Sequence, residues 1–260
     1  IERSGDASER LPAPTSRDEV GELAGTLNAM LASLERAREA EQRFVGDASH
    51  ELRTPLTALR GNIAYVARHG PDSDALADIE ADAARLSGLL DDLLALARED
   101  AAAPVRGEPV DLVEIAREAA AADENAVVEA ADEPVLVRAE RPALERAVGN
   151  LVRNGRRHGP PDGRITIAVD GARISVTDEG PGLTPAEAAR AFERFWRGPA
   201  ASGEGSGLGL AIVRAIAERH GGRVEVRGSR FTIELPALTD LSEAGRTTSS
   251  SSPEDEGPSP

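Results

Sequence analysis

Apolar residues recur at alternating spacings of three and four along the first part of the chain, the pattern of a coiled-coil seam. The first seam comprises Val20, Leu23, Leu27, Met30 and Leu34. The second comprises Val45, Ser49, Leu52, Leu56, Leu59, Ile63 and Val66, and the third comprises Leu76, Ile79, Ala83, Leu86, Leu90, Leu93 and Ala97. The turn-forming stretch HGPDSD separates the last two seams, which predicts an antiparallel helical hairpin. One hairpin cannot cover two seams, so we expect a homodimeric four-helix bundle.

The second seam contains a proline, in the stretch FVGDASHELRTPLTALRG at residues 44–61. Proline inside a helix costs about 3 kcal/mol, so Thr54 could instead cap a new helix with Pro55 at its first position. The seam continues through Pro55, which favours one kinked helix. Leu34 and Val45 lie one heptad plus four residues apart, a stutter that we interpret as a joint between segments.

A different pattern follows AAAPVRGEP at residues 101–109. Helical stretches (DLVEIAREAAAA, RPALERAVGNLVRNGRRHG, GLGLAIVRAIAERHGG) are interleaved with strand-like ones (VLVRAE, RITIAVD, ARISVTDEG, RVEVRG, SRFTIEL). This order predicts an α/β sandwich with helices on one face of a mixed sheet. The expected fold class is therefore α+β multidomain: a helical hairpin forming a dimeric four-helix bundle, followed by an α/β sandwich.

Composition excludes several kinds of chemistry. With 46 acidic and 30 basic side chains, the net charge of −16 disfavours binding to nucleic acids or anionic membranes. There is no cysteine, and all 30 basic residues are arginine, so thiol chemistry and lysine-dependent phosphate loops are both excluded. No apolar run reaches the roughly 18 residues that span a bilayer. Because the chain begins with Ile1, we expect it to be a fragment.

Four groups of residues could carry chemistry. His50 lies beside the seam, where its imidazole could be a nucleophile with Glu51 as base, or simply a solvated surface histidine. Asn150 and Asn154 share one helix face and could bind Mg²⁺ or cap a neighbouring strand. Arg157 and His158, one turn on, could contact phosphate.

The other two groups are glycine-rich. Asp178 ends a strand and could accept a hydrogen bond from the exocyclic amine of adenine, whereas Gly180 and Gly182 could mark only a tight turn. Gly203, Gly205, Gly207 and Gly209 lead directly into a helix, whose first N–H groups favour phosphate. A flexible linker is the alternative for that stretch.

Together these motifs resemble the sensor histidine kinases of bacterial two-component systems, from about Arg17 to Leu235. FVGDASHELRTPLT resembles the H box, NLVRNGRRHG the N box, DEGPG the first glycine box, FERFWR the phenylalanine box and GSGLGLAIV the second glycine box. RDEVGELAGTLNAML resembles the second half of a HAMP linker. The implied domains are a linker with the end of a HAMP domain (1–36), a dimerisation and histidine-phosphotransfer hairpin (37–102), a catalytic ATP-binding domain (105–238) and a disordered tail (239–260).

The resemblance implies a role for each motif residue. His50 would accept the phosphoryl group, Glu51 would act as base, and Thr54 would position water during dephosphorylation of a partner. Asn154 would hold Mg²⁺, and the nucleotide would contact the following residues: Asn150, Asn154, Arg157, His158, Asp178, Gly180, Gly182, Gly205, Gly207, Leu208 and Gly209. Departures from the family pattern are Gly155 in place of alanine, Arg157 and His158 in place of lysine and tyrosine, and a short segment from 199 to 205.

The implied function is autophosphorylation of His50 by Mg-ATP and phosphoryl transfer to a response regulator aspartate. The chain would be the cytoplasmic part of a membrane protein, attached only through a segment that precedes Ile1. Two alternatives remain open: an enzyme that acts mainly as a phosphatase, and a scaffold that binds ATP without turnover.

Overall fold

The computed structural model describes residues 19–101, 107–198 and 205–238. The expected linker at 1–16, the expected tail at 239–260 and Gly203 lie outside these residues. The chain divides into two compact units, residues 1–87 and residues 88–260, and each is described by itself.

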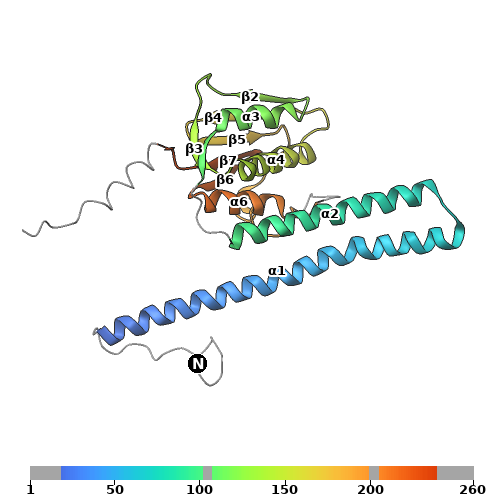
Figure 1. The fold of residues 1–260 in the computed structure, drawn as a ribbon, viewed down its shortest axis with the longest axis horizontal. Helices are drawn as coiled ribbons and strands as arrows, with labels where there is room; N and C mark the ends of the chain where they lie inside the picture. The colour runs from blue at the N-terminus through green and yellow to red at the C-terminus, as the bar shows by residue number, and fades with distance from the viewer. Residues whose placement is uncertain (1–18, 102–106, 199–204, 239–260) are drawn as a thin grey trace, which may run out of the picture. The chain divides into compact units, whose positions relative to one another are not determined.

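The first unit is dominated by α1 (Glu19–His69), a single helix of 51 residues that contains Pro55 (Figure 1). The prediction of one continuous helix through Pro55 is therefore confirmed. Proline has no N–H to offer the carbonyl of Glu51, four residues earlier. Close by, the hydroxyl of Thr54 donates a hydrogen bond of 3.4 Å to the carbonyl of His50. Such bonds from a threonine to the preceding turn accompany helix bending.

A short turn connects α1 to α2 (Ser73–Ala101). Gly70 has a φ of +88°, and its N–H donates to the carbonyl of Val66 at 2.9 Å. Glycine adopts this left-handed conformation without a steric penalty, which is why it commonly ends a helix. The predicted hairpin and its turn are confirmed, and α2 continues past residue 87 into the second unit.

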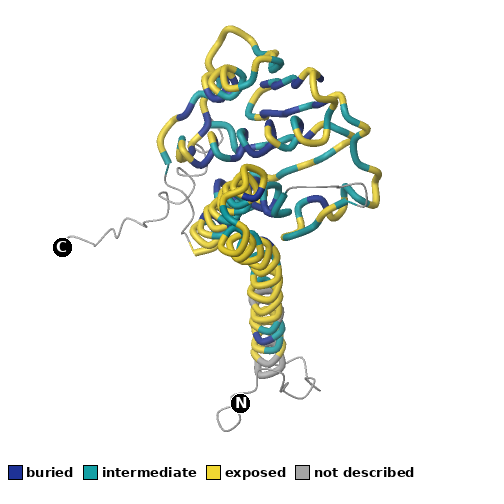
Figure 2. The backbone as a smooth tube through the Cα atoms, turned by 90° about the vertical axis from the view of Figure 1, so that its right-hand side faces the viewer, coloured by how far each residue is buried: buried dark blue, intermediate teal, exposed yellow. Residues whose placement is uncertain are grey.

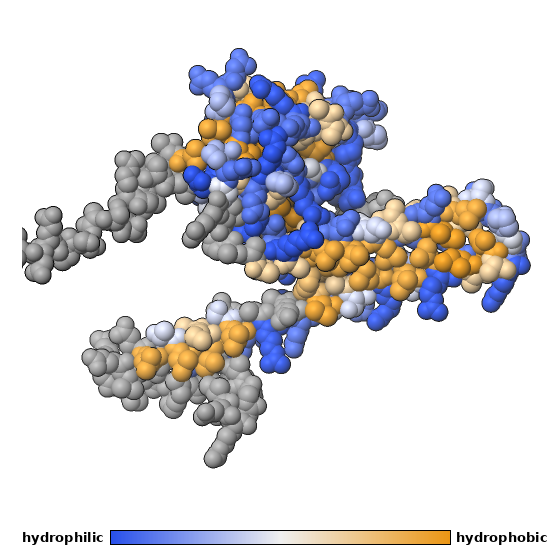
Figure 3. All heavy atoms as spheres, in the orientation of Figure 1, coloured by the Kyte–Doolittle hydropathy of each residue, from blue (hydrophilic) through white to orange (hydrophobic). Residues whose placement is uncertain are grey.

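The apolar seams are largely uncovered. Eight of their side chains are between 44% and 69% exposed: Leu23, Met30, Leu34, Val45, Leu56, Ile63, Leu76 and Leu90. In Figure 3, apolar side chains (orange) gather along both helices instead of being hidden beneath polar ones. A contiguous apolar surface of this kind marks an interaction site. The hairpin therefore presents the surface that the heptads predict for dimerisation.

The second unit contains a five-stranded mixed sheet in the order β2-β4-β5-β7-β6. Its strands are β2 (Ala126–Glu129), β4 (Ile165–Asp170), β5 (Arg173–Thr177), β6 (Arg223–Arg227) and β7 (Arg230–Glu234). Strand β2 pairs parallel to β4, and all other pairs are antiparallel. The predicted hairpins β4–β5 and β6–β7 are both present. A separate two-stranded sheet joins β1 (Glu108–Asp111) to β3 (Leu136–Ala139).

Three helices cover the sheet: α3 (Leu112–Ala121), α4 (Arg141–His158) and α6 (Gly209–Arg219). Helix α4 packs against both α3 and α6, while α3 contacts β2 and β4 and α6 contacts β6 and β7. Their buried side chains meet those of the strands in one core, which appears as the dark blue segments of Figure 2. The largest core side chains include Leu112, Ile115, Leu144, Leu151, Ile167, Ile174, Ile212, Ile216 and Ile233. This confirms the α/β sandwich.

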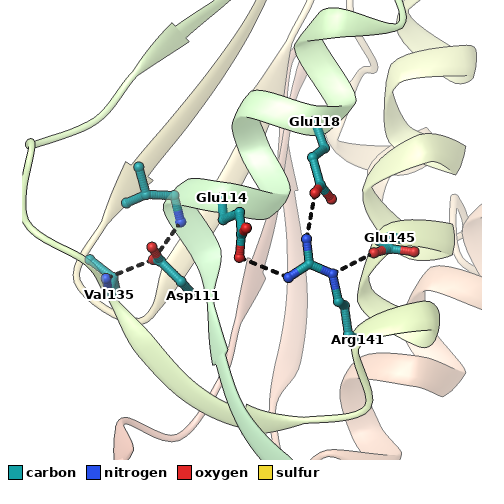
Figure 4. A network of polar contacts seen from close by, with 7 residues as sticks. Asp111, Glu114, Glu118, Val135, Arg141 and Glu145 are labelled. Carbon is teal, nitrogen blue, oxygen red and sulfur yellow. Dashed lines mark hydrogen bonds and ion pairs between the residues drawn. The ribbon is translucent and has the colours of Figure 1, made fainter.

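Polar contacts fix α3 at its N-terminus and along the side that faces α4 (Figure 4). The carboxylate of Asp111 caps the helix by accepting from the N–H of Val113 at 3.0 Å, and it also accepts from Val135 at 2.9 Å. Further along, the guanidinium of Arg141 on α4 pairs with Glu114 at 2.8 Å and Glu118 at 2.5 Å on α3. These exposed pairs are individually weak, so they orient α3 on α4 more than they stabilise the fold.

Candidate nucleotide-binding and phosphoacceptor sites

The predicted phosphoacceptor His50 lies on α1, with its side chain exposed. Glu51 follows it on the same helix and is half-buried, and Thr54 is exposed one turn further on. An exposed imidazole on a helix can be reached by a large partner. No other titratable side chain is bonded to His50 among the described residues.

The other predicted site residues gather around the C-terminal half of α4 in the second unit. Asp178 ends β5 and lies so close to α4 that a Cβ atom added to Gly155 would sit 3.3 Å from its Cβ. The segment after Asp178 approaches the end of α4 equally closely, since a Cβ atom on Gly180 would lie 2.7 Å from the carbonyl oxygen of His158. A side chain at Gly180 would therefore collide with backbone, which explains the glycine.

Helix α4 also meets the glycine-rich start of α6. A Cβ atom on Gly205 would lie 2.6 Å from the guanidinium of Arg157, and the amide of Asn150 donates to the carbonyl of Gly209 at 3.1 Å. Gly205 has a φ of +150° and Gly207 a φ of +68°, conformations that glycine adopts readily. The loop thus requires glycine and lies beside an arginine, while α6 starts with the free N–H groups that favour anions.

Asp178 has the environment expected of a recognition residue. Its side chain is 9% exposed, and its Oδ1 accepts from the N–H of Gly180 at 2.7 Å. Burial raises the pKa of the Asp178 carboxyl, and the Gly180 N–H partly opposes that shift. Burial lowers the pKa of the neighbouring His158 imidazole, and the positive charge of Arg157 lowers it further. A neutral imidazole therefore lies beside a carboxylate whose second oxygen accepts no hydrogen bond from the described residues.

The two asparagines of α4 differ in what they can still bind. The amide of Asn150 is buried and bonded through both of its polar atoms: it donates to the carbonyl of Gly209, and its oxygen accepts from the guanidinium of Arg153. Asn154 is half-buried, and its amide has no hydrogen bond within the described residues. Only the oxygen of Asn154 is free to meet a cation. The residues fit a Mg²⁺ ion whose remaining ligands are phosphate oxygens and water. Asn150 instead joins α4 to α6 in the free protein.

Sequence reasoning missed the residues that support this arrangement. The hydroxyl of Ser229, on the turn between β6 and β7, donates to the carbonyl of Asp178 at 2.7 Å. Ser206 accepts from the N–H of Leu208 at 3.2 Å just before α6 begins. Gly228, which was also missed, has its backbone against the predicted Gly182, whose φ is +68°. Ser206 lies inside the quoted glycine motif, whereas no local signal in the sequence marks Ser229.

Comparison with known proteins agrees with this arrangement. Residues 139–239 match the model of the "Histidine kinase-, DNA gyrase B-, and HSP90-like ATPase" family, residues 40–102 match the "His Kinase A (phospho-acceptor) domain" and residues 2–36 match the "HAMP domain". None of the helices among the described residues is both long and apolar enough to cross a bilayer.

Curated relatives are similar over most of this chain. Probable sensor histidine kinase TcrY from Mycobacterium tuberculosis is 35% identical, over 87% of this chain and 54% of the relative. Signal transduction histidine-protein kinase/phosphatase MprB from Mycolicibacterium vanbaalenii is 37% identical, over 86% of this chain and 51% of the relative. The chain spans about half the length of these relatives.

Among solved structures, histidine kinase ThkA in complex with response regulator protein TrrA is similar, with a TM-score of 0.61 and 25% identity. The likeness covers 79% of this chain and 66% of that chain. The family models, the relatives and the structure agree with the motifs, and the chain belongs to the sensor histidine kinases of bacterial two-component systems.

Proposed function

We propose that this chain uses Mg-ATP to phosphorylate His50 and passes the phosphoryl group to an aspartate of a response regulator. The observation that carries the proposal is the gathering of Asp178, Asn154 and the glycine-rich start of α6 around the C-terminal half of α4. These elements form an adenine contact, a free oxygen ligand and a phosphate-binding helix start in one place. The exposed His50 on the hairpin supplies the acceptor.

On the nucleotide side, the free carboxylate oxygen of Asp178 accepts from the exocyclic amine of adenine. The glycines at positions 180 and 182 leave room for the base. The N–H groups of Gly207 and Gly209 face the phosphates, while that of Leu208 is bonded to the hydroxyl of Ser206 in the free protein. Arg157 pairs with a phosphate oxygen, for which its fixed charge suits it. Asn154 would hold Mg²⁺, which would supply positive charge to the transferring phosphoryl group.

On the acceptor side, one ring nitrogen of His50 attacks the γ-phosphorus as the bond to the leaving ADP oxygen breaks. The proton on the other ring nitrogen passes to Glu51, the adjacent carboxylate on α1. The phosphohistidine then gives its phosphoryl group to the regulator's aspartate, and Glu51 returns the proton to the ring, which restores the neutral imidazole. Positioning and charge neutralisation supply most of the rate enhancement in such a reaction.

Dephosphorylation of the same regulator is a second activity that this hairpin supports. The relative from Mycolicibacterium vanbaalenii is described as a kinase/phosphatase. In this chain, Thr54 presents a hydroxyl one turn beyond His50, where it can orient water toward a bound aspartyl phosphate. Thr54→Ala should therefore slow dephosphorylation of the regulator while preserving autophosphorylation. Equal dephosphorylation by the variant and the wild type would exclude this role.

The partners follow from the exposed surfaces and from the family. The uncovered seams of α1 and α2 pair in a homodimer, and the face of α1 that carries His50 receives the receiver domain of a response regulator. The HAMP match at residues 2–36 supports a membrane-anchored protein, of which this chain is the cytoplasmic part. The acidic net charge of −16 disfavours nucleic acid as a partner.

Autophosphorylation with γ-labelled ATP and Mg²⁺ tests the proposal, with wild type compared with His50→Gln. We expect a label that is labile in acid and stable in base, as a phosphohistidine is, and that disappears in the variant. Binding of ATP without labelling of the wild type would favour a scaffold. Label that persists in His50→Gln would assign the acceptor to another residue.

A further inference from the structure

The last turns of α2 belong to the second unit, residues 88–260, and contact the rest of that unit through polar side chains. The carboxylate of Glu99 pairs with the guanidinium of Arg219 on α6 at 2.5 Å, and the two side chains are 12% and 10% exposed. Asp100 accepts from Arg194 at 2.7 and 2.8 Å. Arg219 also pairs with Glu140 at 2.5 Å, so Glu99 is one of two carboxylates beside this guanidinium and attaches the end of α2 to α6.

One more contact of α2, made by Asp92, lies at the candidate phosphate site. The hydroxyl of Ser206 donates to the carboxylate of Asp92 at 3.0 Å and accepts from the N–H of Leu208 at 3.2 Å. Helix α6 begins at the next residue, Gly209. The carboxylate of Asp92 is therefore tied to the positive end of α6, through a serine of the glycine-rich loop.

We propose that Asp92 forms an autoinhibitory contact: its carboxylate occupies the loop in which the phosphates of ATP bind, so ATP and the docked end of α2 exclude each other. This inference rests on the proposed function. The carboxylate of Asp92 and the phosphate oxygens carry the same sign of charge, so they repel each other if both lie at the start of α6, where Ser206 holds Asp92. Release of the end of α2 therefore accompanies tight binding of ATP.

The neighbouring residue Asp91 shows that the feature is specific to Asp92. Asp91 is exposed, and Arg146 donates to its backbone carbonyl at 3.0 Å and not to its side chain. Its carboxylate has no partner among the described residues. Replacing Asp91 removes the same charge from the same helix, without touching the contact with Ser206, which makes Asp91→Asn a matched control for Asp92→Asn.

Affinities for ATP and for adenosine, measured by calorimetry on the full chain, test the inference. Asp92→Asn keeps the shape of the side chain but removes its charge, so it should bind ATP about ten-fold more tightly, as expected from one unfavourable charge near the phosphates. Adenosine has no phosphate and should bind the variant and the wild type equally. Asp91→Asn should match the wild type for both ligands.

Equal ATP affinity for Asp92→Asn and wild type, or an equal gain for ATP and adenosine, would overturn the autoinhibitory contact alone. If none of the three proteins bound ATP, the proposed function would fail and this inference with it. A second variant, Glu99→Gln, weakens the contact between α2 and α6 at a position away from the glycine-rich loop. It should also strengthen ATP binding, and Asp92→Asn should then add little in the double variant.

Glu145→Gln is the control for this second variant, since Glu145 pairs with Arg141 on an exposed part of α4. It should leave ATP affinity unchanged. Full additivity of Glu99→Gln and Asp92→Asn would show that the two residues act independently, and it would contradict a single docked state.

Discussion

The backbones of Gly182 and Gly228 approach each other so closely that a Cβ atom on Gly182 would lie 2.4 Å from the carbonyl carbon of Gly228. Beside this contact, the N–H of Leu183 donates to the carbonyl of Gly228 at 2.9 Å. The turn between β6 and β7 therefore supports the loop that follows Asp178. Ser229 on the same turn bonds the carbonyl of Asp178 itself.

Gly182→Ala should consequently lower the free energy of unfolding and weaken ATP binding. We expect a loss of roughly 2–4 kcal/mol, from the φ of +68° and from displacement of the facing backbone. Gly171→Ala is the matched control, because Gly171 has a φ of +53° but no atom near the added Cβ. Chemical denaturation should show a loss of only about 1 kcal/mol for the control. Equal losses in the two variants would contradict the role of close approach.

Asp178→Asn should weaken ATP binding and stabilise the free protein. Loss of a charged hydrogen bond to adenine predicts an affinity about 10- to 100-fold lower in calorimetry. Because burial raises the pKa of Asp178, the folded state at neutral pH holds a carboxylate at a cost that the amide avoids. Such a gain in stability at the expense of binding is common at functional sites.

The stabilisation by Asp178→Asn should depend on pH in a defined direction. The folded protein takes up a proton at Asp178 at higher pH than the unfolded chain, whose value is near 3.8. The penalty is therefore fully present above the raised pKa and disappears as the pH falls toward 3.8. Thermal unfolding across that range should show the advantage of the variant shrinking with acidity. A constant advantage at every pH would argue against an ionised, desolvated Asp178.

His220 should make stability depend on pH near neutrality. Its side chain is 7% exposed, its Nε2 accepts from the N–H of Glu140 at 3.1 Å, and its Nδ1 lies 2.7 Å from the carbonyl of Ile216. A protonated ring could not accept from Glu140. Burial lowers the pKa of His220 accordingly, so the unfolded chain, with a value near 6.5, takes up the proton first.

The stability that neutral His220 contributes should thus be fully present above pH 6.5. Below that pH the free energy of unfolding should fall, with a slope of at most about 1.4 kcal/mol per pH unit for one proton. His220→Gln cannot take up this proton and should flatten the slope in denaturant titrations between pH 7 and 5. His69→Gln, at an exposed position, is the control and should keep it. An unchanged slope in His220→Gln would assign the dependence to other groups.

Local periodicity explains which parts of the fold could be predicted from the sequence. The seams of α1 and α2 repeat over many turns, and β4 and β5 alternate next to each other, so each signal lies within one stretch of chain. Strands β1 and β2 and helix α5 (Pro185–Ala188) were not predicted, and each has four residues. Strand β3 is as short, but it lies in the apolar stretch VLVRAE and was predicted. Strand β2 pairs with β4, so that Ala126 lies opposite Ile165. The sequence around Ala126 carries no local signal for a partner so far along the chain.

In the candidate site too, local motifs were predicted and contacts between distant residues were not. Asn154, Asp178 and Gly205 belong to short motifs whose composition alone suggests phosphate or base recognition. The bond from Ser229 to Asp178 and the bond from Asp92 to Ser206 join residues far apart in the chain. The sequence also could not show that Arg153 occupies the oxygen of Asn150, because that depends on which rotamers the packed helices allow.

The uncovered seam makes dimerisation depend on single apolar residues of the hairpin. Ile63 is 51% exposed on α1, and burial of such a side chain in a helical bundle contributes about 1.5–3 kcal/mol. Ile63→Asp would place a charge in the buried seam of both copies, so we expect light scattering to show monomers at concentrations where the wild type is dimeric. Ala64→Asp adds the same charge at the adjacent exposed position, outside the heptad pattern, and should remain dimeric. Dissociation by both variants alike would show that the added charge acts without regard to the seam, and a dimeric Ile63→Asp would place the interface elsewhere.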